Sequence, residues 1–145
     1  MPLSFEDKQE IHELFARYGH AIDSGAADDL AATFTPDGTF DGPGGKHTGT
    51  EQIRTMGIEY HEHPDINNTQ HWTNSIVVDG DGDEANAVCY AMCVSPTVDG
   101  EAIRIELINR YEDELRRVDG SWRFHRRVVK DVFPESINDF SLDAS

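Results

Sequence analysis

Apolar residues near the start of the chain recur at the spacing of a helix. The positions that repeat every three or four residues are Ile11, Leu14, Phe15, Tyr18 and Ile22. Such a repeat places the side chains on one face, which can then pack on a core. Ser4 followed by Asp7 resembles a capping box, which marks a helix start. The sequence therefore predicts a first helix over Ser4 to Ile22.

Shorter elements are predicted before residue 70. Residues 28 to 34 keep a helical apolar face and predict a second helix. Residues 35 to 38, Thr-Pro-Asp-Gly, are typical of a turn, and residues 39 to 41 of a short strand. Residues 51 to 61 again repeat at helical spacing and predict a third helix. Residues 62 to 69 are polar and predict a loop.

From Gln70 onward the apolar period changes to two, which is the period of strands. The four predicted strands are His71 to Val78, Glu84 to Val94, Glu101 to Leu115 and Ser121 to Phe133. Each gap between them contains an Asp-Gly pair, and such pairs are common in hairpin loops. We therefore expect an antiparallel meander.

Helices followed by a meander predict a single two-layer α+β domain over residues 1–145, because each element must bury one apolar face. One face of the second predicted strand carries only small side chains. These are Ala85, Ala87, Cys89, Ala91 and Cys93. The other face carries larger residues, so we expect both faces to be covered, one of them by a second subunit in a homodimer or homotrimer.

The charge of the chain excludes some partners. With 28 acidic against 12 basic side chains the formal net charge is -16, and this field repels nucleic acid and anionic membrane surfaces. No apolar run is long enough to span a bilayer and the first residues lack a signal pattern, so we expect a cytoplasmic location. Cys89 and Cys93 lie about 13 Å apart along a strand, beyond disulfide reach, and are expected to be reduced core residues.

Asp23 and His71 are the first candidates for chemistry. Asp23 directly follows the predicted first helix, where an aspartate can also serve only as a helix terminator. His71 begins a strand, where a histidine can also be merely structural. If the two side chains meet, the carboxylate fixes the imidazole tautomer and leaves the other ring nitrogen to act as a base.

Tyr18 and an arginine of the last strand are candidate partners. Tyr18 lies on the buried face of the first helix and could donate a hydrogen bond to a substrate oxygen, or be a core tyrosine. Alternation along the last strand places Arg126 on the face shared by Trp122 and Phe124, whereas a bulge would place Arg127 there instead. A buried arginine requires an anion, and Asp23 or a developing oxyanion could supply it.

Cofactor and metal sites are not indicated. His61, Glu62 and His63 are of types that bind zinc or iron, but they lie in a polar stretch without the helical spacing of known zinc motifs. The sequence contains no phosphate-binding loop, dinucleotide glycine motif or nucleophile elbow. We therefore expect no cofactor and no bound metal.

Several segments resemble one known family. They are Tyr18 to Gly25, Phe34 to Gly38, His71 to Asn74, Tyr111 to Asp113, and Gly120 to Phe124 with Arg126 and Arg127. In these segments the chain resembles the SnoaL-like group of the nuclear transport factor 2-like superfamily, which includes bile acid dehydratase, scytalone dehydratase and hexachlorocyclohexane dehydrochlorinase. The resemblance implies a cone-shaped, curved antiparallel sheet, an α+β barrel, closed by three N-terminal helices around a ligand cavity.

The resemblance also implies roles for individual residues. Catalytic members carry an Asp/His dyad at the positions of Asp23 and His71, and a tyrosine like Tyr18 and an arginine like Arg126 or Arg127 recur in dehydratases. A second tyrosine found opposite the dyad in scytalone dehydratase corresponds to either Tyr60 or Tyr111. The residues expected to line the substrate pocket are Phe34, Tyr60, Trp72, Asn109 and Tyr111.

These expectations lead to two functional hypotheses. The first is a cofactor-independent lyase or isomerase, similar to a dehydratase, that removes a proton from an apolar cyclic substrate. The second is a non-catalytic small-molecule-binding module or subunit of the same fold, because one fold hosts many functions.

Overall fold

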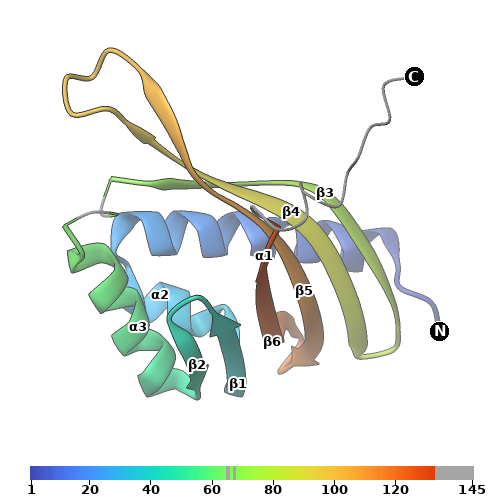
Figure 1. The fold of residues 1–145 in the computed structure, drawn as a ribbon. Helices are drawn as coiled ribbons and strands as arrows, with labels where there is room; N and C mark the ends of the chain where they lie inside the picture. The colour runs from blue at the N-terminus through green and yellow to red at the C-terminus, as the bar shows by residue number, and fades with distance from the viewer. Residues whose placement is uncertain (65, 67, 133–145) are drawn as a thin grey trace, which may run out of the picture.

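The computed structural model describes residues 1–64, 66 and 68–132, and it shows helices packed against one curved sheet (Figure 1). The elements are α1 (Phe5–Ser24), α2 (Ala27–Ala32), β1 (Phe34–Gly42), β2 (Gly45–Thr48), α3 (Thr50–Glu62), β3 (Gln70–Asp81), β4 (Glu84–Pro96), β5 (Ile103–Val118) and β6 (Ser121–Asp131). Within the described part, no helix combines the length and apolarity needed to cross a membrane.

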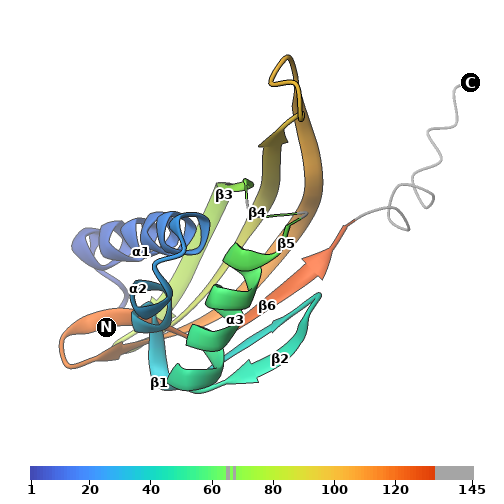
Figure 2. The same ribbon diagram turned by 90° about the vertical axis from the view of Figure 1, so that its left-hand side faces the viewer.

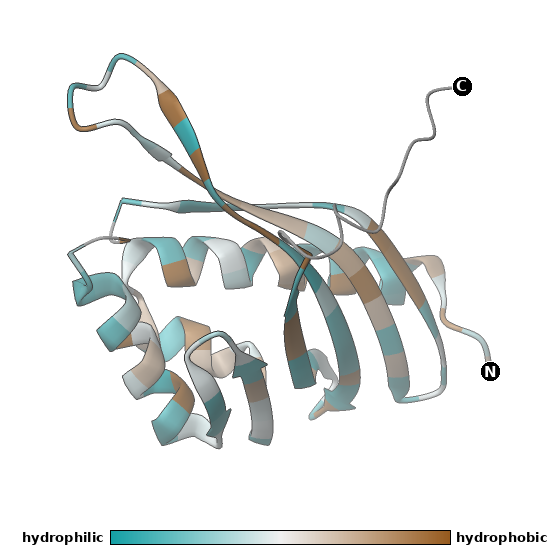
Figure 3. Ribbon diagram, viewed as in Figure 1, coloured by the Kyte–Doolittle hydropathy of each residue, from teal (hydrophilic) through white to brown (hydrophobic). Residues whose placement is uncertain are grey.

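Helix α1 begins and ends at recognisable signals. The backbone N–H of Asp7 donates to the Ser4 hydroxyl and the backbone N–H of Ser4 donates to the Asp7 carboxylate, both at 3.0 Å, so the expected capping box is present. The helix ends at Gly25, which adopts a left-handed conformation with φ 76°. It ends two residues later than predicted, so Asp23 lies inside its last turn and does not terminate it. Hydrophobic and hydrophilic residues alternate along α1 (Figure 3).

The six strands form one sheet in the order β2-β1-β6-β5-β4-β3. Strands β1 and β6 run parallel, and the other neighbours run antiparallel. The sheet is curved but not closed, because β2 and β3 lie at opposite edges. Helix α1 crosses its concave side and packs on β3 and β6, while α3 lies beside α2 and β1 (Figure 2). The α+β class is therefore confirmed, with an open sheet where the resemblance implied a cone.

Local differences from the predicted elements occur mainly around β1 and β2. The segment 35–38, predicted as a turn, belongs to β1, because Phe34 already pairs with Phe124 of β6. Helix α2 consequently ends at Ala32, before Phe34. Strand β2 was not predicted, since four residues that include Gly45 and no apolar side chain show no strand period. The predicted end of the last strand, Phe133, lies outside the described residues.

The small-residue face of β4 is covered by the chain itself and not by a second subunit. The small side chains of its inner face are 1–3% exposed, and those of Ala85, Ala87, Cys89 and Ala91 pack in the core formed with α1. The chain thus covers this face itself. Large side chains lie instead on the outer face, where Trp72 and Tyr90 are each 50% exposed.

Candidate functional site

A mostly apolar cavity of about 310 Å³ lies between α1, α3 and the inner face of the sheet. Its apolar lining includes Ile22, Phe40, Met56, Leu107 and Val129. The polar side chains that reach it include Tyr18, Tyr60, His71, Cys93, Asn109 and Tyr111. A pocket that is largely apolar, with a few converging polar groups, is typical of small-molecule sites.

Asp23 and His71 meet at the wall of this cavity. Asp23 Oδ1 lies 2.6 Å from Nδ1 of His71, and Asp23 Oδ2 accepts a hydrogen bond of 2.9 Å from the backbone N–H of His71. One carboxylate from the last turn of α1 therefore fixes both the ring and the backbone at the start of β3. His71 lines the cavity, whereas Asp23 lies behind it, along a surface groove between α1 and β3.

The surroundings of His71 favour its protonated form. Burial alone would lower its pKa, but hydrogen bonds to Asp23 and Cys93, together with the charges of these two groups, outweigh burial and raise the pKa to about 9. Because Nδ1 is engaged by Asp23, Nε2 is the nitrogen left to exchange a proton with a ligand.

Three tyrosines border the cavity near His71. The Tyr60 hydroxyl lies 2.7 Å from Oγ1 of Thr69, and its ring centroid is 5.5 Å from that of His71. Burial raises the pKa of Tyr60 to about 12 and also raises the pKa values of Tyr18 and Tyr111. All three hydroxyls are therefore protonated at neutral pH and can donate hydrogen bonds.

The arginine that faces inward is Arg127. Its Nε and Nη2 donate to the two carboxylate oxygens of Asp113 at 2.8 and 2.9 Å, and both side chains have no exposed surface. An irregularity in the pairing of β5 with β6 shifts the alternation after Phe124. Of the two alternatives left open by the sequence, the bulge that places Arg127 inside is therefore the one observed, and Arg126 is exposed. The anion that pairs with Arg127 is Asp113, not Asp23.

Arg127 lies behind the cavity wall and does not line it. Its guanidinium carbon is 4.3 and 4.4 Å from the ring centroids of Tyr18 and Tyr111, and 3.9 Å from that of Phe124. A cation over aromatic faces is stabilised by their quadrupoles. Its positive charge thus lies beneath two of the tyrosines that border the cavity.

The residues predicted to line the pocket separate into two groups. Tyr60, Asn109 and Tyr111 line the cavity. Phe34 and Trp72 do not. Phe34 is 1% exposed and packs in the core against Tyr18 and Phe124, with ring centroids 6.3 and 5.6 Å away. Trp72 points to the outer side, where its indole N–H donates to Gln70 at 3.1 Å.

Sequence reasoning missed several lining residues. Phe40 and Met56 carry no chemical signal that separates a cavity wall from a packed core. Cys93 was interpreted only as a core residue, although it lies opposite His71 in the pairing of β3 with β4. The signal that could have found it is the antiparallel register across the loop between these strands. An irregularity between Asn74 and Val77 hides that register from simple counting.

Metal binding by the His61, Glu62 and His63 segment has no structural support. All three side chains are exposed at the end of α3. Among residues 1–64, 66 and 68–132, no three histidine, cysteine, aspartate or glutamate side chains are grouped as metal ligands would be.

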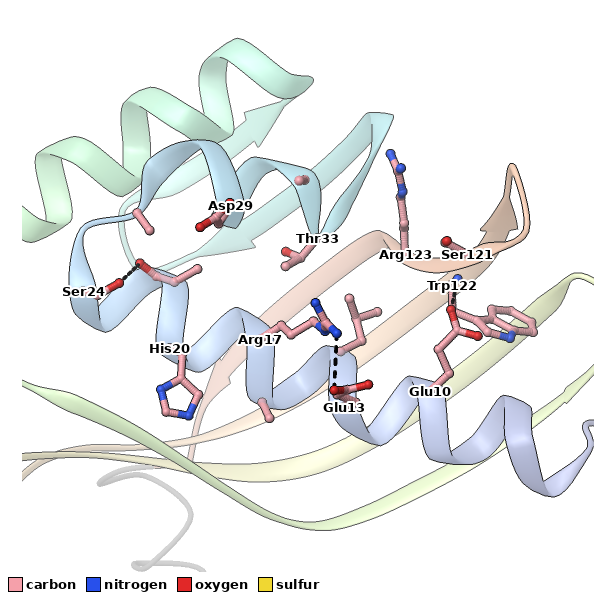
Figure 4. Close-up of a pocket in the computed structure, with 15 residues that line it drawn as sticks. Glu10, Glu13, Arg17, His20, Ser24, Asp29, Thr33, Ser121, Trp122 and Arg123 are labelled. Atoms are coloured by element: carbon pink, nitrogen blue, oxygen red, sulfur yellow. Dashed lines mark hydrogen bonds and ion pairs between the residues drawn. The ribbon is translucent and has the colours of Figure 1, made fainter.

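A second hollow, of about 740 Å³, lies between α1, α2 and the start of β6 (Figure 4). Three of its charged groups, Arg17, Glu13 and Glu10, already have partners. Arg17 contacts Glu13 at 3.3 Å, and Glu10 accepts a hydrogen bond of 2.9 Å from the backbone N–H of Trp122. None of the candidate catalytic residues lines it. The His71 cavity is therefore the better candidate site.

Comparisons with known proteins agree with this fold. Residues 4–128 match the family model of the SnoaL-like domain. The search of curated proteins found no match. The chain is similar to a solved Nostoc punctiforme protein of unknown function with a cystatin-like fold, at 26% identity over 90% of this chain and 95% of that one, with a TM-score of 0.81.

Two solved structures from Novosphingobium aromaticivorans are also similar. One is an NTF2-like protein with a cystatin-like fold, at 28% identity over 97% of this chain and 84% of that one, with a TM-score of 0.78. The other is a scytalone dehydratase-like protein, at 23% identity over 86% of this chain and 83% of that one, with a TM-score of 0.72. At this level of identity the second likeness shows the fold alone.

Proposed function

Because the chain belongs to the SnoaL-like family, we propose that it is a cofactor-independent, dehydratase-like lyase or isomerase acting on an apolar cyclic small molecule. The observation that carries the proposal is the contact of 2.6 Å between Asp23 and Nδ1 of His71 at the wall of an apolar cavity. Proton transfer and elimination need only a positioned base and hydrogen-bond donors, which side chains supply.

The reaction proceeds through proton transfer at Nε2 of His71. The neutral ring removes a proton next to a carbonyl or leaving group, and the Asp23 carboxylate stabilises the imidazolium that forms. The Tyr18 hydroxyl donates to the oxygen on which negative charge develops. Arg127, behind the ring of Tyr18, favours that negative charge through its own positive charge. The imidazolium then returns the proton to the product or protonates the leaving group.

The raised pKa of His71, about 9, determines how this mechanism depends on pH. At neutral pH most molecules carry the imidazolium, which can protonate a leaving hydroxyl, and a minority carry the neutral base. Proton removal therefore becomes faster as the pH rises toward 9. A raised pKa also makes the neutral imidazole a stronger base once it forms.

The proposal is tested with steroid-like, polyketide-like and halogenated cyclic compounds, using product detection by mass spectrometry. On an accepted substrate, His71→Ala is expected to lower kcat by at least about 100-fold, as is typical for a lost general base, and Asp23→Asn by less. His20→Ala is the matched control, because His20 is exposed on α1 and does not line the cavity. Equal turnover by wild type and His71→Ala would remove His71 from the mechanism.

The alternative function, a non-catalytic binding module, is supported by the cavity itself, which offers an apolar site whether or not a reaction occurs. It predicts that ring compounds raise the melting temperature through binding to the folded state. Stabilisation by such compounds without turnover of any of them would favour this alternative over the enzyme.

A further inference from the structure

The cavity wall beside His71 carries a thiol that the proposed proton transfer does not use. Cys93 of β4 lies directly opposite His71 of β3 in the strand register. Both side chains line the cavity, and Cys93 is buried, with 1% of its surface exposed. The thiol shares this cavity with the side chains of His71 and Tyr60.

The groups that face Cys93 come from every element around it. Helices α1 and α3 contribute Tyr18 and Tyr60, and strands β3 and β5 contribute His71 and Tyr111. The three tyrosines are protonated at neutral pH, since burial raises their pKa values. His71, in the molecules whose ring is neutral, is thus the group among these four that can take the thiol proton.

Asp23 completes a Cys-His-Asp arrangement. Because Asp23 holds Nδ1 of His71 at 2.6 Å, Nε2 is the ring nitrogen that remains for the thiol. A nucleophile, a base that takes its proton and a third group that orients the base form the general pattern of nucleophilic catalysis. The raised pKa of His71, about 9, shows that the imidazolium is stabilised in this place.

We propose that Cys93 is a nucleophile of the cavity, activated by His71, that forms covalent adducts with apolar cyclic α,β-unsaturated carbonyl compounds. From the neutral ring of His71, which is present in a minority of molecules at neutral pH, Nε2 accepts the thiol proton, and the thiolate forms a carbon–sulfur bond at the β-carbon of the ligand. The π electrons of the carbon–carbon double bond move onto the carbonyl oxygen as an enolate. The His71 imidazolium then protonates the α-carbon, so no oxidant or other reactant is consumed.

The site fits this ligand class. The cavity offers about 310 Å³ of mostly apolar space for a ring, and the protonated tyrosines can donate to the enolate oxygen. Elimination next to a carbonyl also generates an α,β-unsaturated carbonyl, so a product of lyase chemistry would belong to the class that Cys93 captures. The adduct itself requires no turnover, so its detection can succeed or fail independently of the proposed function.

Cys89 provides a control within the same strand. It lies on the same inner face of β4 and is 2% exposed, but it does not line the cavity. Burial raises its pKa to about 11, which disfavours the reactive thiolate. If burial alone set the labelling rate, Cys89 and Cys93 would react equally fast. If the cavity and His71 set it, Cys93 would react faster.

The test uses 2-cyclohexen-1-one as the ligand probe and iodoacetamide as a second electrophile, with intact-protein and peptide mass spectrometry. We expect a single adduct on Cys93, at least tenfold faster than on Cys89. Cys93→Ser should abolish it and Cys89→Ser should leave its rate unchanged. His71→Gln should slow labelling of Cys93 at least tenfold at neutral pH, while both cysteines in urea-unfolded protein react as before.

Three results would overturn the proposal. They are equal labelling of the two cysteines, no labelling of folded wild type under conditions that label the unfolded chain, and equal rates in wild type and His71→Gln when both are folded by circular dichroism. If His71→Gln does not fold, Asp23→Asn replaces it, because it retains the imidazole and removes only the charge that stabilises the imidazolium. An unchanged rate in that variant would equally contradict the proposal.

Discussion

At the scale of single residues, the proton on His71 is controlled by two neighbours. The Asp23 carboxylate holds Nδ1 and the backbone N–H, and Cys93 lies opposite His71 in the strand register and lines the same cavity. Burial opposes the charge of the imidazolium, so a pKa of about 9 requires these partners. Removal of the Asp23 charge should therefore lower the pKa of His71 more than a substitution at a residue that does not contact His71.

The first prediction is that His71 titrates near pH 9 and that Asp23→Asn lowers its pKa, because the amide contributes no negative charge to stabilise the imidazolium. Titration of the imidazole signals by NMR measures this without a substrate. The His71 signal is assigned by its disappearance in His71→Gln. A His71 pKa at or below about 6.5, the usual value for histidine, would show that the carboxylate does not stabilise the charged ring.

At the scale of elements, the irregular pairing of β5 with β6 decides which arginine lies inside. It turns Arg127 inward, where its Nε and Nη2 donate to the Asp113 carboxylate of β5 at 2.8 and 2.9 Å. Burial raises the pKa of Asp113, and the adjacent guanidinium opposes that rise. Each member of this buried pair therefore depends on the other.

The second prediction is that Arg127→Met lowers the free energy of unfolding by about 3–5 kcal/mol, because it leaves Asp113 buried without its partner. The double variant Arg127→Met with Asp113→Leu should be more stable than the single variant, since it leaves no buried charge. Urea unfolding followed by circular dichroism measures both. A single variant as stable as wild type would mean that the pair contributes nothing to folding.

The sequence predicted the helices and strands whose apolar positions repeat regularly. It did not predict which side chains face inward where that depends on how two strands pair. Helix α1 and strands β3 to β6 were predicted, because their apolar positions repeat over many residues. The inward arginine was not decided, since alternation favoured Arg126 and only the register of two strands places Arg127 inside. The contact of Asp23 with His71 was expected from the resemblance, while the Cys93 thiol was not, because its position opposite His71 depends on an irregular pairing.

At the scale of the whole molecule, the two sides of the sheet have different partners. The inner face packs on α1 and encloses the cavity. The outer face carries large apolar side chains exposed to solvent, among them Val77 at 63% and Tyr90 at 50%. In the pairing of β3 with β4, Val77 lies opposite Val88 and Asn74 lies opposite Tyr90. Val77 and Tyr90 therefore share one surface of the sheet.

We propose that a second copy of the chain covers this outer surface, and the third prediction is a dimer or trimer in solution. Burial of exposed apolar side chains stabilises such contacts. Light scattering measures the mass directly. Tyr90→Glu should lower the mass toward that of a monomer, and Phe5→Glu, at the exposed start of α1, should not. A monomer at high micromolar concentration would contradict the assembly.

Proton transfer by His71, with its pKa raised by Asp23, can be tested through the pH dependence of kcat/KM on an accepted substrate in wild type and in Asp23→Asn. We expect wild-type kcat/KM to rise about tenfold per pH unit below the His71 pKa and to level off above about 9. In Asp23→Asn the same rise should end at a lower pH and a lower plateau, because the imidazole is a weaker base. Profiles with the same midpoint in both proteins, or a wild-type rate that falls through pH 9, would contradict it.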